Sequence, residues 1–597
     1  MSNAVDIKKI VFDLVGCDYN IPVTELMAED LYVKYDGECA VIAADTVPAK
    51  ARGYLLLAKA IAEGKTAYEV RQKAAFSTLG PMLDVSRGGV MKVSAVKKYL
   101  QCIAALGMNM LMLYTEDTYE VEGYPFFGYQ RGRYTLKELQ EIDDYADALG
   151  IEVIPCIQTL GHMEQYLRYP TSGVVKDTAT VMLVGAEATY DLIRACVSTM
   201  RKAFRSNRIH IGCDEASDLG LGSYLRKNGY HDRFDLFNQH LRRVAEICKE
   251  FGYHPMMWSD VYFNIADKNR KEGYAPHVQI PQHVVDAMPD CDMVFWNYYH
   301  KDNAFYQINI EKHQSFNRKA VFAGGIWTWS GFVPNFRLTY ETMKPALEEC
   351  VRCGVEDVII TLWGNDGTET DYFLSNPMLC LFSEYCWQGA DCTKEAIWDL
   401  AAFFTGTTEE LAEAVSDFFF RLAPGIRAGK HILWSDPLIN LLFHGFDLDE
   451  GIRYLENALA VFEKYPNHKD IEYYKAVFRT CLHKCRLQLQ FREHYKAGDR
   501  DWLQNFAEVT IPKILEDFEK LYNLHYAIWH TSYKVQGFER LMCRYAAARE
   551  RLHYTQKTVL RYLTGEITEI EELEPELVFY KPVRGGSARD YMYIASH

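Results

Sequence analysis

Two adjacent carboxylates follow a short apolar run, and they are the residues of this chain best suited to acid–base chemistry. The run is Arg208-Ile209-His210-Ile211-Gly212-Cys213, and Asp214 and Glu215 come directly after it. Paired carboxylates act as general acid and as base or nucleophile in glycoside hydrolysis, where they flank the bond that breaks. Two acids at a strand end are more simply explained as a cap for the next helix. The residues around the pair must decide between these interpretations.

Polar and aromatic side chains also follow the neighbouring apolar runs. Aromatic faces stack on the C–H faces of sugar rings, while polar side chains take the hydroxyls. No His or acidic cluster has metal-ligand spacing, so we expect neither metal nor cofactor. The pattern favours a neutral, hydroxyl-rich ligand bound among Arg87, Glu116, His162, Trp258, Trp296, Tyr298, Tyr299, Trp327, Trp329, Trp363, Asn365 and Asp366.

Eight apolar runs alternate with connectors, most of which have helical periodicity. This rhythm, over roughly 300 residues, predicts an α/β fold, a (β/α)8 TIM barrel whose chemistry lies at the C-terminal ends of its strands. A doubly wound open sheet is the alternative, but no Gly-rich phosphate motif follows the first run. The runs are residues 80–85, 108–114, 151–156, 208–213, 254–258, 293–296, 320–324 and 357–362.

The 597 residues exceed what one hydrophobic core holds, so we expect several domains. Residues 1–75 predict a small α+β domain with strands at 10–12, 31–33 and 39–44 and a helix at 50–63. Residues 76–395 form the predicted barrel. Residues 396–597 predict an α-helical C-terminal domain, with helices at 409–422, 470–495, 502–522 (broken before Pro512) and 538–562.

Charge and cysteine usage limit the partners. The net charge of −16 argues against nucleic acid and anionic membranes as partners. No run approaches the roughly 18 apolar residues of a membrane span, and the N-terminus lacks a secretion-signal pattern. Sixteen scattered cysteines, many in apolar contexts, indicate a reducing, cytoplasmic compartment. Three roles stay open for the C-terminal domain: it could complete the active site, mediate a homodimer, or only buttress the barrel. Many exposed Tyr on its helices would suit the homodimer.

Four motifs, taken together and in order, resemble glycoside hydrolase family 20, the β-N-acetylhexosaminidases, over residues 80–370. His210-Ile211-Gly212-Cys213-Asp214-Glu215 is similar to the family's H-x-G-x-D-E signature, and Leu83-Asp84-Val85-Ser86-Arg87 to its L-D-x-S-R motif. Leu160-Gly161-His162 resembles its P-G-H turn, with Leu160 where Pro is usual. Trp363-Gly364-Asn365 stands where Trp-Gly-Glu is common. The helical tail and the absent signal resemble the family's intracellular bacterial branch.

The resemblance implies a retaining, exo-acting β-N-acetylhexosaminidase in which the 2-acetamido group of the substrate is the nucleophile. Glu215 would be the general acid, and an apolar wall beside it would favour its protonated form. Asp214 would accept the acetamido N–H and stabilise the oxazolinium ion. Tyr298, or else Tyr299, would bind the acetamido oxygen. Arg87, with Asn365 or Asp366, would hold the hydroxyls of the terminal sugar, and His162 would lie beneath the acidic pair.

Two other functions remain open from the residues alone. One is a β-glycosidase that uses two protein carboxylates, for instance Glu215 with Asp260 or Asp366, on sugars without an acetamido group. The other is a sugar-binding barrel without catalysis. The expected substrates are glycans or glycoconjugates that end in β-linked GlcNAc, or in GalNAc, which differs only at O4.

Overall fold

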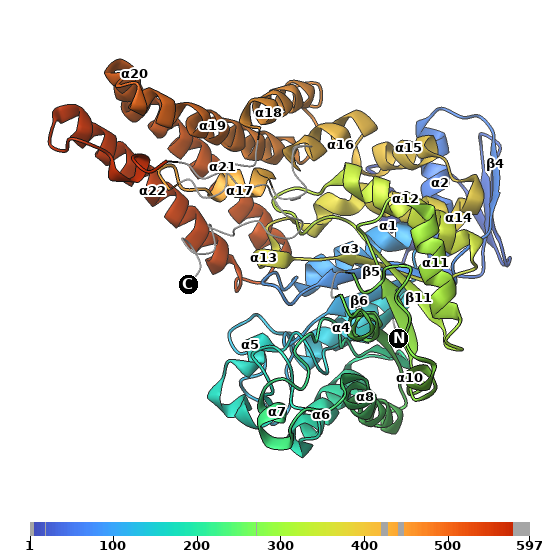
Figure 1. Ribbon diagram of the computed structural model, residues 1–597. Helices are drawn as coiled ribbons and strands as arrows, with labels where there is room; N and C mark the ends of the chain where they lie inside the picture. Colours follow the sequence, from blue (N-terminus) through green and yellow to red (C-terminus); the bar gives the residue numbers. More distant parts are fainter. Residues whose placement is uncertain (1–4, 18–19, 270–271, 420–427, 440–446, 577–597) are drawn as a thin grey trace.

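A closed barrel of eight parallel strands forms the centre of the computed structural model, which describes residues 5–17, 20–269, 272–419, 428–439 and 447–576 (Figure 1). Pairing of β12 with β5 closes the barrel, with Ile360 opposite Pro81. The predicted TIM barrel is confirmed. Its strands are β5 (Thr78–Asp84), β6 (Met110–Tyr114), β7 (Glu152–Cys156), β8 (Arg208–His210), β9 (His254–Trp258), β10 (Asp292–Trp296), β11 (Ala320–Gly325) and β12 (Asp357–Leu362).

The strands lie close to their predicted positions because they are buried on both faces. A strand covered on both sides reads as an almost continuous apolar run, and every residue of β6 and β12 is buried. The exception is β8, which ends at His210, three residues before the predicted end at Cys213. The chain turns there through Gly212 (φ 70°) and Cys213 (φ 73°). Asp214 and Glu215 therefore belong to a loop.

Amphipathic helices surround the barrel and bury one face against it. The helix α4 begins with a capping box, in which Thr135 Oγ1 accepts from the Glu138 N–H at 3.2 Å and Glu138 Oε2 accepts from the Thr135 N–H at 2.8 Å. The principal helices are α3 (Val93–Ala105), α4 (Leu136–Ala148), α6 (Glu187–Ala203), α8 (Arg233–Glu250), α11 (Asn303–Gln314), α12 (Phe336–Arg352) and α14 (Asn376–Gln388).

The N-terminal residues form a four-stranded sheet, in the order β1-β3-β2-β4, with two helices. The strand predicted at 10–12 is wrong, because these residues lie in α1. Asp6 caps that helix by accepting from the Lys9 N–H at 3.0 Å, and Ile7 and Val11 share its buried face. The elements are α1 (Ile7–Leu14), β1 (Val23–Leu26), β2 (Leu31–Tyr35), β3 (Ala40–Ala43), α2 (Val47–Ala62) and β4 (Tyr68–Gln72).

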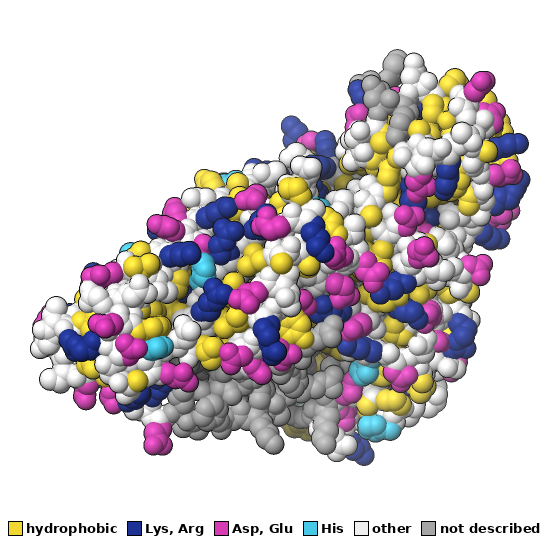
Figure 2. Space-filling view, turned by 90° about the horizontal axis from the view of Figure 1, so that it is seen from above, with side chains coloured by type: hydrophobic (Ala, Val, Ile, Leu, Met, Phe, Trp, Pro, Cys, Tyr) yellow, Lys and Arg dark blue, Asp and Glu magenta, His cyan; other side chains and the backbone are white. Residues whose placement is uncertain are grey.

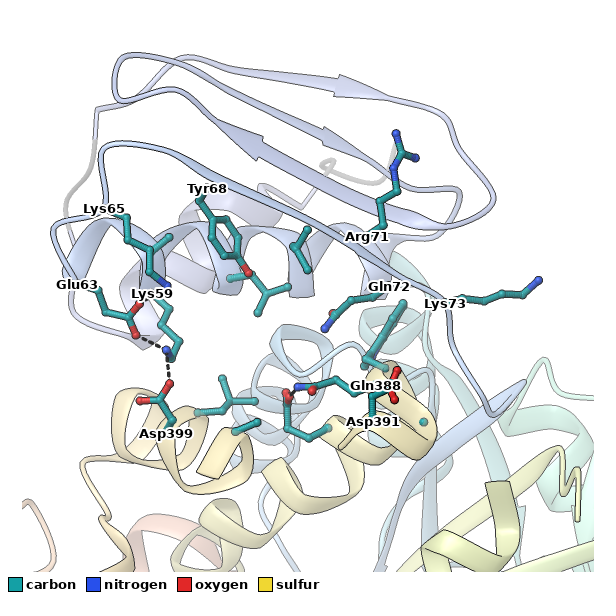
Figure 3. A pocket seen from close by; sticks show the side chains of 18 residues that line it. Lys59, Glu63, Lys65, Tyr68, Arg71, Gln72, Lys73, Gln388, Asp391 and Asp399 are labelled. Carbon is teal, nitrogen blue, oxygen red and sulfur yellow. Dashed lines mark hydrogen bonds and ion pairs between the residues drawn. The ribbon is translucent and has the colours of Figure 1, made fainter. Parts of the chain in front are cut away.

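A cavity of about 580 Å³ lies where this N-terminal unit meets α14 and α15 (Lys394–Thr405). Figure 3 shows Lys59 of α2 between Glu63 and Asp399, and its Nζ is 2.6 Å from Asp399 Oδ2. Behind the cavity the buried Arg52 guanidinium pairs with Glu384 at 2.8 Å. The ion pairs Lys59–Asp399 and Arg52–Glu384 join the two units.

The C-terminal helices extend to one side of the barrel, as the orange and red ribbons of Figure 1 show. The helix predicted at 502–522 exists, and the break before Pro512 is a π-helical turn at Phe506–Thr510. The helix predicted at 409–422 ends at Ser416, and its residues 420–422 lie outside the described residues. The helices are α16 (Glu409–Ser416), α17 (Ala428–Trp434), α18 (Leu448–Phe462), α19 (Ile471–Lys496), α20 (Arg500–Asn505), α21 (Ile511–Ser532) and α22 (Phe538–Thr564).

The surface carries both signs of charge, and acidic and basic side chains are interspersed over the face in Figure 2. All sixteen cysteines are unpaired thiols, most of them buried. Within the described ranges, none of the helices combines the length and the apolar character that crossing a membrane requires.

Candidate active site

The two adjacent acids reach the same imidazole. His162 Nε2 lies 3.1 Å from Asp214 Oδ2 and 3.2 Å from Glu215 Oε2. In a straight strand neighbouring side chains point to opposite faces. Here the left-handed backbone of Cys213 (φ 73°) and Glu215 (φ 50°) brings both carboxylates to one side. Non-glycine residues rarely adopt such angles, and they do so mainly where function requires a fixed geometry.

Asp214 is held as a buried anion. Gln158 Nε2 donates to its Oδ1 at 2.7 Å, and His162 faces its other oxygen. Burial by itself would raise the pKa of this carboxyl, but the charge and contact of His162, with Gln158 and Arg87, hold the pKa below its usual range. Burial likewise opposes the charged form of His162, yet Asp214 and Glu215 raise the pKa of His162 well above its usual value. An imidazolium and a carboxylate therefore face each other.

Glu215 is open to the solvent side of the site, and its side chain is 58% exposed. This exposure does not fit the apolar enclosure that we expected for Glu215. Its backbone N–H instead donates to Asp260 Oδ2 at 3.0 Å, which fixes the turn. Asp260 is only 1% exposed, and burial together with the Asp214 charge raises its pKa. Asp260 therefore positions Glu215 from below and is closed to a ligand.

Arg87 is clamped at the ends of β5 and β6. Its Nη1 lies 2.9 Å from Asp84 Oδ2, and its Nη2 lies 3.5 Å from Glu116 Oε1. The guanidinium sits 5.2 Å from the ring centres of both Tyr114 and Trp363. Burial raises the pKa of Glu116 to about 7, against the opposing effects of Arg87 and His162. The clamp fixes Arg87 at the mouth of the barrel, one-fifth exposed.

Four of the five predicted tryptophans contact Tyr298. Its ring lies 5.4 Å from Trp296, 4.9 Å from Trp329 and 6.2 Å from Trp327, measured between ring centres. Trp363 Nε1 donates to the Tyr298 hydroxyl oxygen at 3.0 Å, so the hydroxyl keeps its own proton to donate. Burial raises the pKa of Tyr298 well above its usual value, which keeps that proton bound.

The remaining aromatic candidates divide into one exposed and one buried residue. Tyr299, the next residue along, is 42% exposed, so the alternation expected between the two tyrosines is present. Trp258 is buried beneath the site and contacts Trp363 at 6.1 Å between ring centres. Trp258 is therefore a packing residue in this geometry, below the aromatic wall.

The loop after β12 binds the C-terminal helices. Asp366 Oδ2 lies 3.1 Å from Lys430 Nζ of α17, and the same ammonium lies 2.5 Å from the buried Glu369. Arg544 of α22 pairs with Glu369 as well, at 2.9 Å. The sequence predicted Asp366 as a sugar contact, yet its carboxylate is engaged by Lys430. The side chain of its neighbour Asn365 is half-buried at the mouth.

Gln158 is a site residue that was absent from the predicted set. It joins three parts of the site: Nε2 donates to Asp214 Oδ1 and to the Tyr114 hydroxyl, both at 2.7 Å, and Oε1 accepts from the Cys213 N–H at 3.1 Å. The available signal was its place two residues after the third strand. Alone, that place did not separate Gln158 from its polar neighbour Thr159, whose hydroxyl bonds to a backbone carbonyl.

Gly212 makes room for this network, and its replacement should be costly. A Cβ there would lie 2.1 Å from Gln158 Oε1. We expect Gly212→Ala to lower the free energy of unfolding by at least about 3 kcal/mol, since a clash adds to the left-handed backbone cost of about 1–2 kcal/mol. Gly252→Ala is the matched control, with the same backbone region (φ 74°) and nothing within 4 Å of its Cβ. Urea titration of both variants checks this, and equal losses would refute the role of the clash.

Two family models match the chain, one over the barrel and one over the C-terminal helices. "Glycosyl hydrolase family 20, catalytic domain" matches residues 76–275, and "Glycoside Hydrolase 20C C-terminal domain" matches residues 422–591. Hexosaminidase D of Bos taurus is 26% identical over 204 residues, which are 33% of this chain and 59% of that protein. Beta-hexosaminidase 3 of Arabidopsis thaliana is 25% identical over 222 residues, 34% of this chain and 41% of that protein. The chain thus spans about half the length of these relatives.

A solved structure shares the architecture over most of the chain. The chitobiase of Flavobacterium johnsoniae superposes with a TM-score of 0.50 at 14% identity, covering 95% of this chain and 89% of that one. At this identity the likeness concerns the fold alone. It agrees with the arrangement of barrel and flanking units described above.

Proposed function

This chain belongs to glycosyl hydrolase family 20, and we propose that it is a retaining exo-β-N-acetylhexosaminidase. Its substrates would be glycans or glycoconjugates with a terminal, non-reducing β-linked GlcNAc or GalNAc. The observation that carries the proposal is the shared contact of Asp214 and Glu215 with His162. One acid is buried and ionised, and the other is exposed beside it. That division suits two different roles on one face of a sugar.

In the first step the acetamido carbonyl oxygen attacks C1 and the glycosidic bond breaks. Glu215 donates its proton to the leaving oxygen. A C1–O bond forms as the other breaks, which gives a cyclic oxazolinium ion. Asp214 accepts the acetamido N–H and stabilises the positive charge that develops there. Tyr298 donates its hydroxyl proton in a hydrogen bond to the acetamido oxygen and so aligns it for attack.

In the second step water opens the oxazolinium ion. Glu215, now ionised, takes the proton of the water that attacks C1, and the acetamido group is restored. Two inversions at C1 give net retention. Arg87, held by Asp84 and Glu116, is placed to bind the hydroxyls of the terminal sugar. In the loop after β12, Asp366 pairs with Lys430. Asn365 is therefore the residue of that loop that would bind the sugar hydroxyls.

The geometry favours this mechanism over one with two protein carboxylates. A retaining pair stands roughly 5 Å apart on opposite faces of the sugar. Asp260 is buried and accepts the Glu215 N–H, and Asp366 is paired with Lys430. Neither carboxylate is available across the site from Glu215. This supports the proposal that the acetamido group of the substrate supplies the nucleophile.

A pair of chromogenic substrates tests the proposal. We expect kcat/KM for an aryl N-acetyl-β-glucosaminide to exceed that for the matching aryl β-glucoside by at least about 10³-fold, since effective molarities of intramolecular nucleophiles are of that order or larger. A thiazoline analogue of the intermediate should bind more tightly than the substrate by at least about 10²-fold. Equal cleavage of the two glycosides would refute substrate assistance. Binding of a GlcNAc disaccharide without release of sugar would indicate a non-catalytic protein.

Replacing each tyrosine separates their roles. We expect Tyr298→Phe to lower kcat by roughly 10- to 100-fold, because one hydrogen bond to a charge-bearing oxygen is lost. The matched variant Tyr299→Phe should lower it by less than about 3-fold, since an exposed hydroxyl contributes little. Steady-state kinetics on the N-acetylglucosaminide give both values. A larger loss at Tyr299 would reverse the assignment.

The cellular setting is also a proposal. Sixteen free thiols support a reducing compartment, hence the cytoplasm. A homodimer through the Tyr-bearing C-terminal helices is consistent with the exposed Tyr526 and Tyr554 on α21 and α22. Sedimentation of the purified chain measures its oligomeric state directly.

A further inference from the structure

A small pocket beside the barrel mouth is lined by three arginines from three separate segments. Its volume is about 300 Å³, and Gly88 forms part of its wall. Arg131 comes from the loop after β6, Arg168 from the segment after β7, and Arg540 from the first turn of α22. We call Gly88, Arg131, Arg168 and Arg540 the arginine pocket. Segments distant in the sequence thus bring positive charge to one cavity.

Within the described residues, two of the three guanidinium groups are not held in an ion pair. Arg131 is satisfied, because its Nε lies 2.9 Å from Asp117 Oδ1 and it also donates to the Ser86 carbonyl. Across the described part of the chain, no side-chain hydrogen bond or ion pair is formed by Arg168 or by Arg540. Glu539 also lines the pocket, but its Oε2 accepts from the Gly537 N–H at 2.6 Å.

Arg540 lowers the stability of the fold as long as no anion is bound beside it. It is half-buried, and burial followed by the positive charge of Arg131 lowers the pKa of Arg540, against the opposing charge of Glu539. A partly desolvated cation among like charges destabilises the protein unless an anion joins it. An oxyanion that accepts hydrogen bonds from several guanidinium groups offsets that cost. Arginine is the side chain best shaped for such contacts.

The arginine pocket is built partly from residues next in sequence to those of the candidate active site. Gly88 directly follows Arg87, and Asp117, the partner of Arg131, directly follows Glu116. Arg87 and Glu116 are the pair at the ends of β5 and β6. Glu215 stands after β8, away from these two strands in the barrel order. A group in the pocket therefore lies toward the non-reducing side of the sugar that the proposed function places at Arg87.

We infer that the arginine pocket binds a tetrahedral oxyanion ester, a sulfate or phosphate group, carried by the terminal N-acetylhexosamine of the substrate. The inference rests on the proposed function and extends its substrate class from neutral sugars to their sulfate or phosphate esters. The open guanidinium groups of Arg168 and Arg540 contact the ester oxygens. Arg131, fixed by Asp117, supplies the rigid side of the pocket.

The test compares charged and neutral substrates in the full-length protein. The probes are an aryl N-acetyl-β-glucosaminide, its 3-, 4- and 6-O-sulfates and its 6-phosphate. We expect at least one ester to be cleaved with kcat/KM equal to or above that of the neutral sugar. Arg540→Met and Arg168→Met should each lower the ester-to-neutral ratio of kcat/KM by about 10-fold, mainly through KM. Arg540→Lys should recover part of the ester-to-neutral ratio, because lysine restores the positive charge but not the two parallel N–H donors of a guanidinium.

A matched control excludes a general effect of lost charge. Arg549→Met removes a guanidinium from the same helix, nine residues farther on, where it pairs with Glu519 at 2.8 Å. It should leave the ester-to-neutral ratio unchanged. Melting temperatures of all variants show whether each folds. If Arg540→Met and Arg168→Met change both substrates by one factor, or if every ester is cleaved at least 100-fold less well than the neutral sugar, the inference is wrong.

A direct binding measurement tests the arginine pocket independently of the proposed catalytic function. Calorimetry with N-acetylglucosamine, its monosulfates and its 6-phosphate needs no turnover. At least 10-fold tighter binding of one ester, lost in Arg540→Met, supports the arginine pocket even if no glycoside is cleaved. Whether the sulfate or the phosphate binds more tightly identifies the source of the oxyanion. Equal affinity of every ester and the neutral sugar overturns the inference.

Discussion

Glu215→Gln should reduce kcat on an alkyl N-acetyl-β-glucosaminide by at least about 10³-fold, because a positioned general acid contributes about 10²–10⁴-fold and Glu215 serves in both steps. The amide has no proton to give to the leaving oxygen and cannot activate water. The exposed side chain makes few contacts of its own, so the fold should be unchanged. Steady-state kinetics with a range of aglycones measure the loss. The way in which the loss of kcat depends on the aglycone shows whether Glu215 acts as the acid.

A substrate with a good leaving group separates acid catalysis from structural damage. A dinitrophenyl aglycone departs without a proton, so bond cleavage by Glu215→Gln should recover most of its rate in a pre-steady-state burst. Glu250→Gln, an exposed acid paired with Arg194, is the matched control and should leave every rate unchanged. Equal losses for all aglycones would contradict the role of Glu215 as the acid.

Asp214→Asn should lower kcat on N-acetylglucosaminides by roughly 10²–10³-fold, the usual cost of removing an electrostatic group at a developing charge. Asp214 acts on the acetamido group, so the loss should be similar for good and poor leaving groups. Affinity for the thiazoline analogue should fall by a comparable factor, because that analogue carries the charge of the intermediate. Kinetics and inhibition constants measured together give both quantities.

The same variant has a spectroscopic signature. Asp214 is the main group that raises the pKa of His162, against the opposing effect of burial. We therefore expect the His162 pKa to fall in Asp214→Asn, as measured by NMR titration of the imidazole. Asp292→Asn is the control: it removes a carboxylate that lies 2.9 Å from His254 at the other end of the barrel, and should not move the His162 pKa. A His162 pKa unaltered by Asp214→Asn would contradict the ion pair described above.

The barrel was predictable because its strands are apolar on both faces, and a run such as 357–362 coincides with the strand found. The site was predictable as a set of strand ends, which placed Arg87, His162 and Tyr298 at one mouth. The short helix α1 was misread as a strand, since three apolar residues carry no period of their own. The N-cap at Asp6 and the burial of the apolar side of the segment determine that it is a helix.

Backbone conformation and long-range contacts were beyond the sequence. The residue types of Cys213-Asp214-Glu215 do not predict the left-handed backbone angles that turn both acids toward His162. The exposure of the Glu215 side chain could not be predicted for the same reason, because it follows from that turn. Lys430 pairs with Asp366 across 64 positions of the chain. The sequence alone cannot predict such a partner, because the contact depends on how the helices pack against the barrel.

The buried ammonium of Lys430 has a consequence for modularity. It lies within a module with its own family model, 422–591, yet its charge is neutralised by Asp366 and Glu369 of the barrel. Cutting the chain between the two modules would separate two cations, Lys430 and Arg544, from their two acidic partners, and each broken pair would cost several kcal/mol. The gene is thus a poor source of a stand-alone barrel, and a chimera with a foreign helical module would need a lysine at this place.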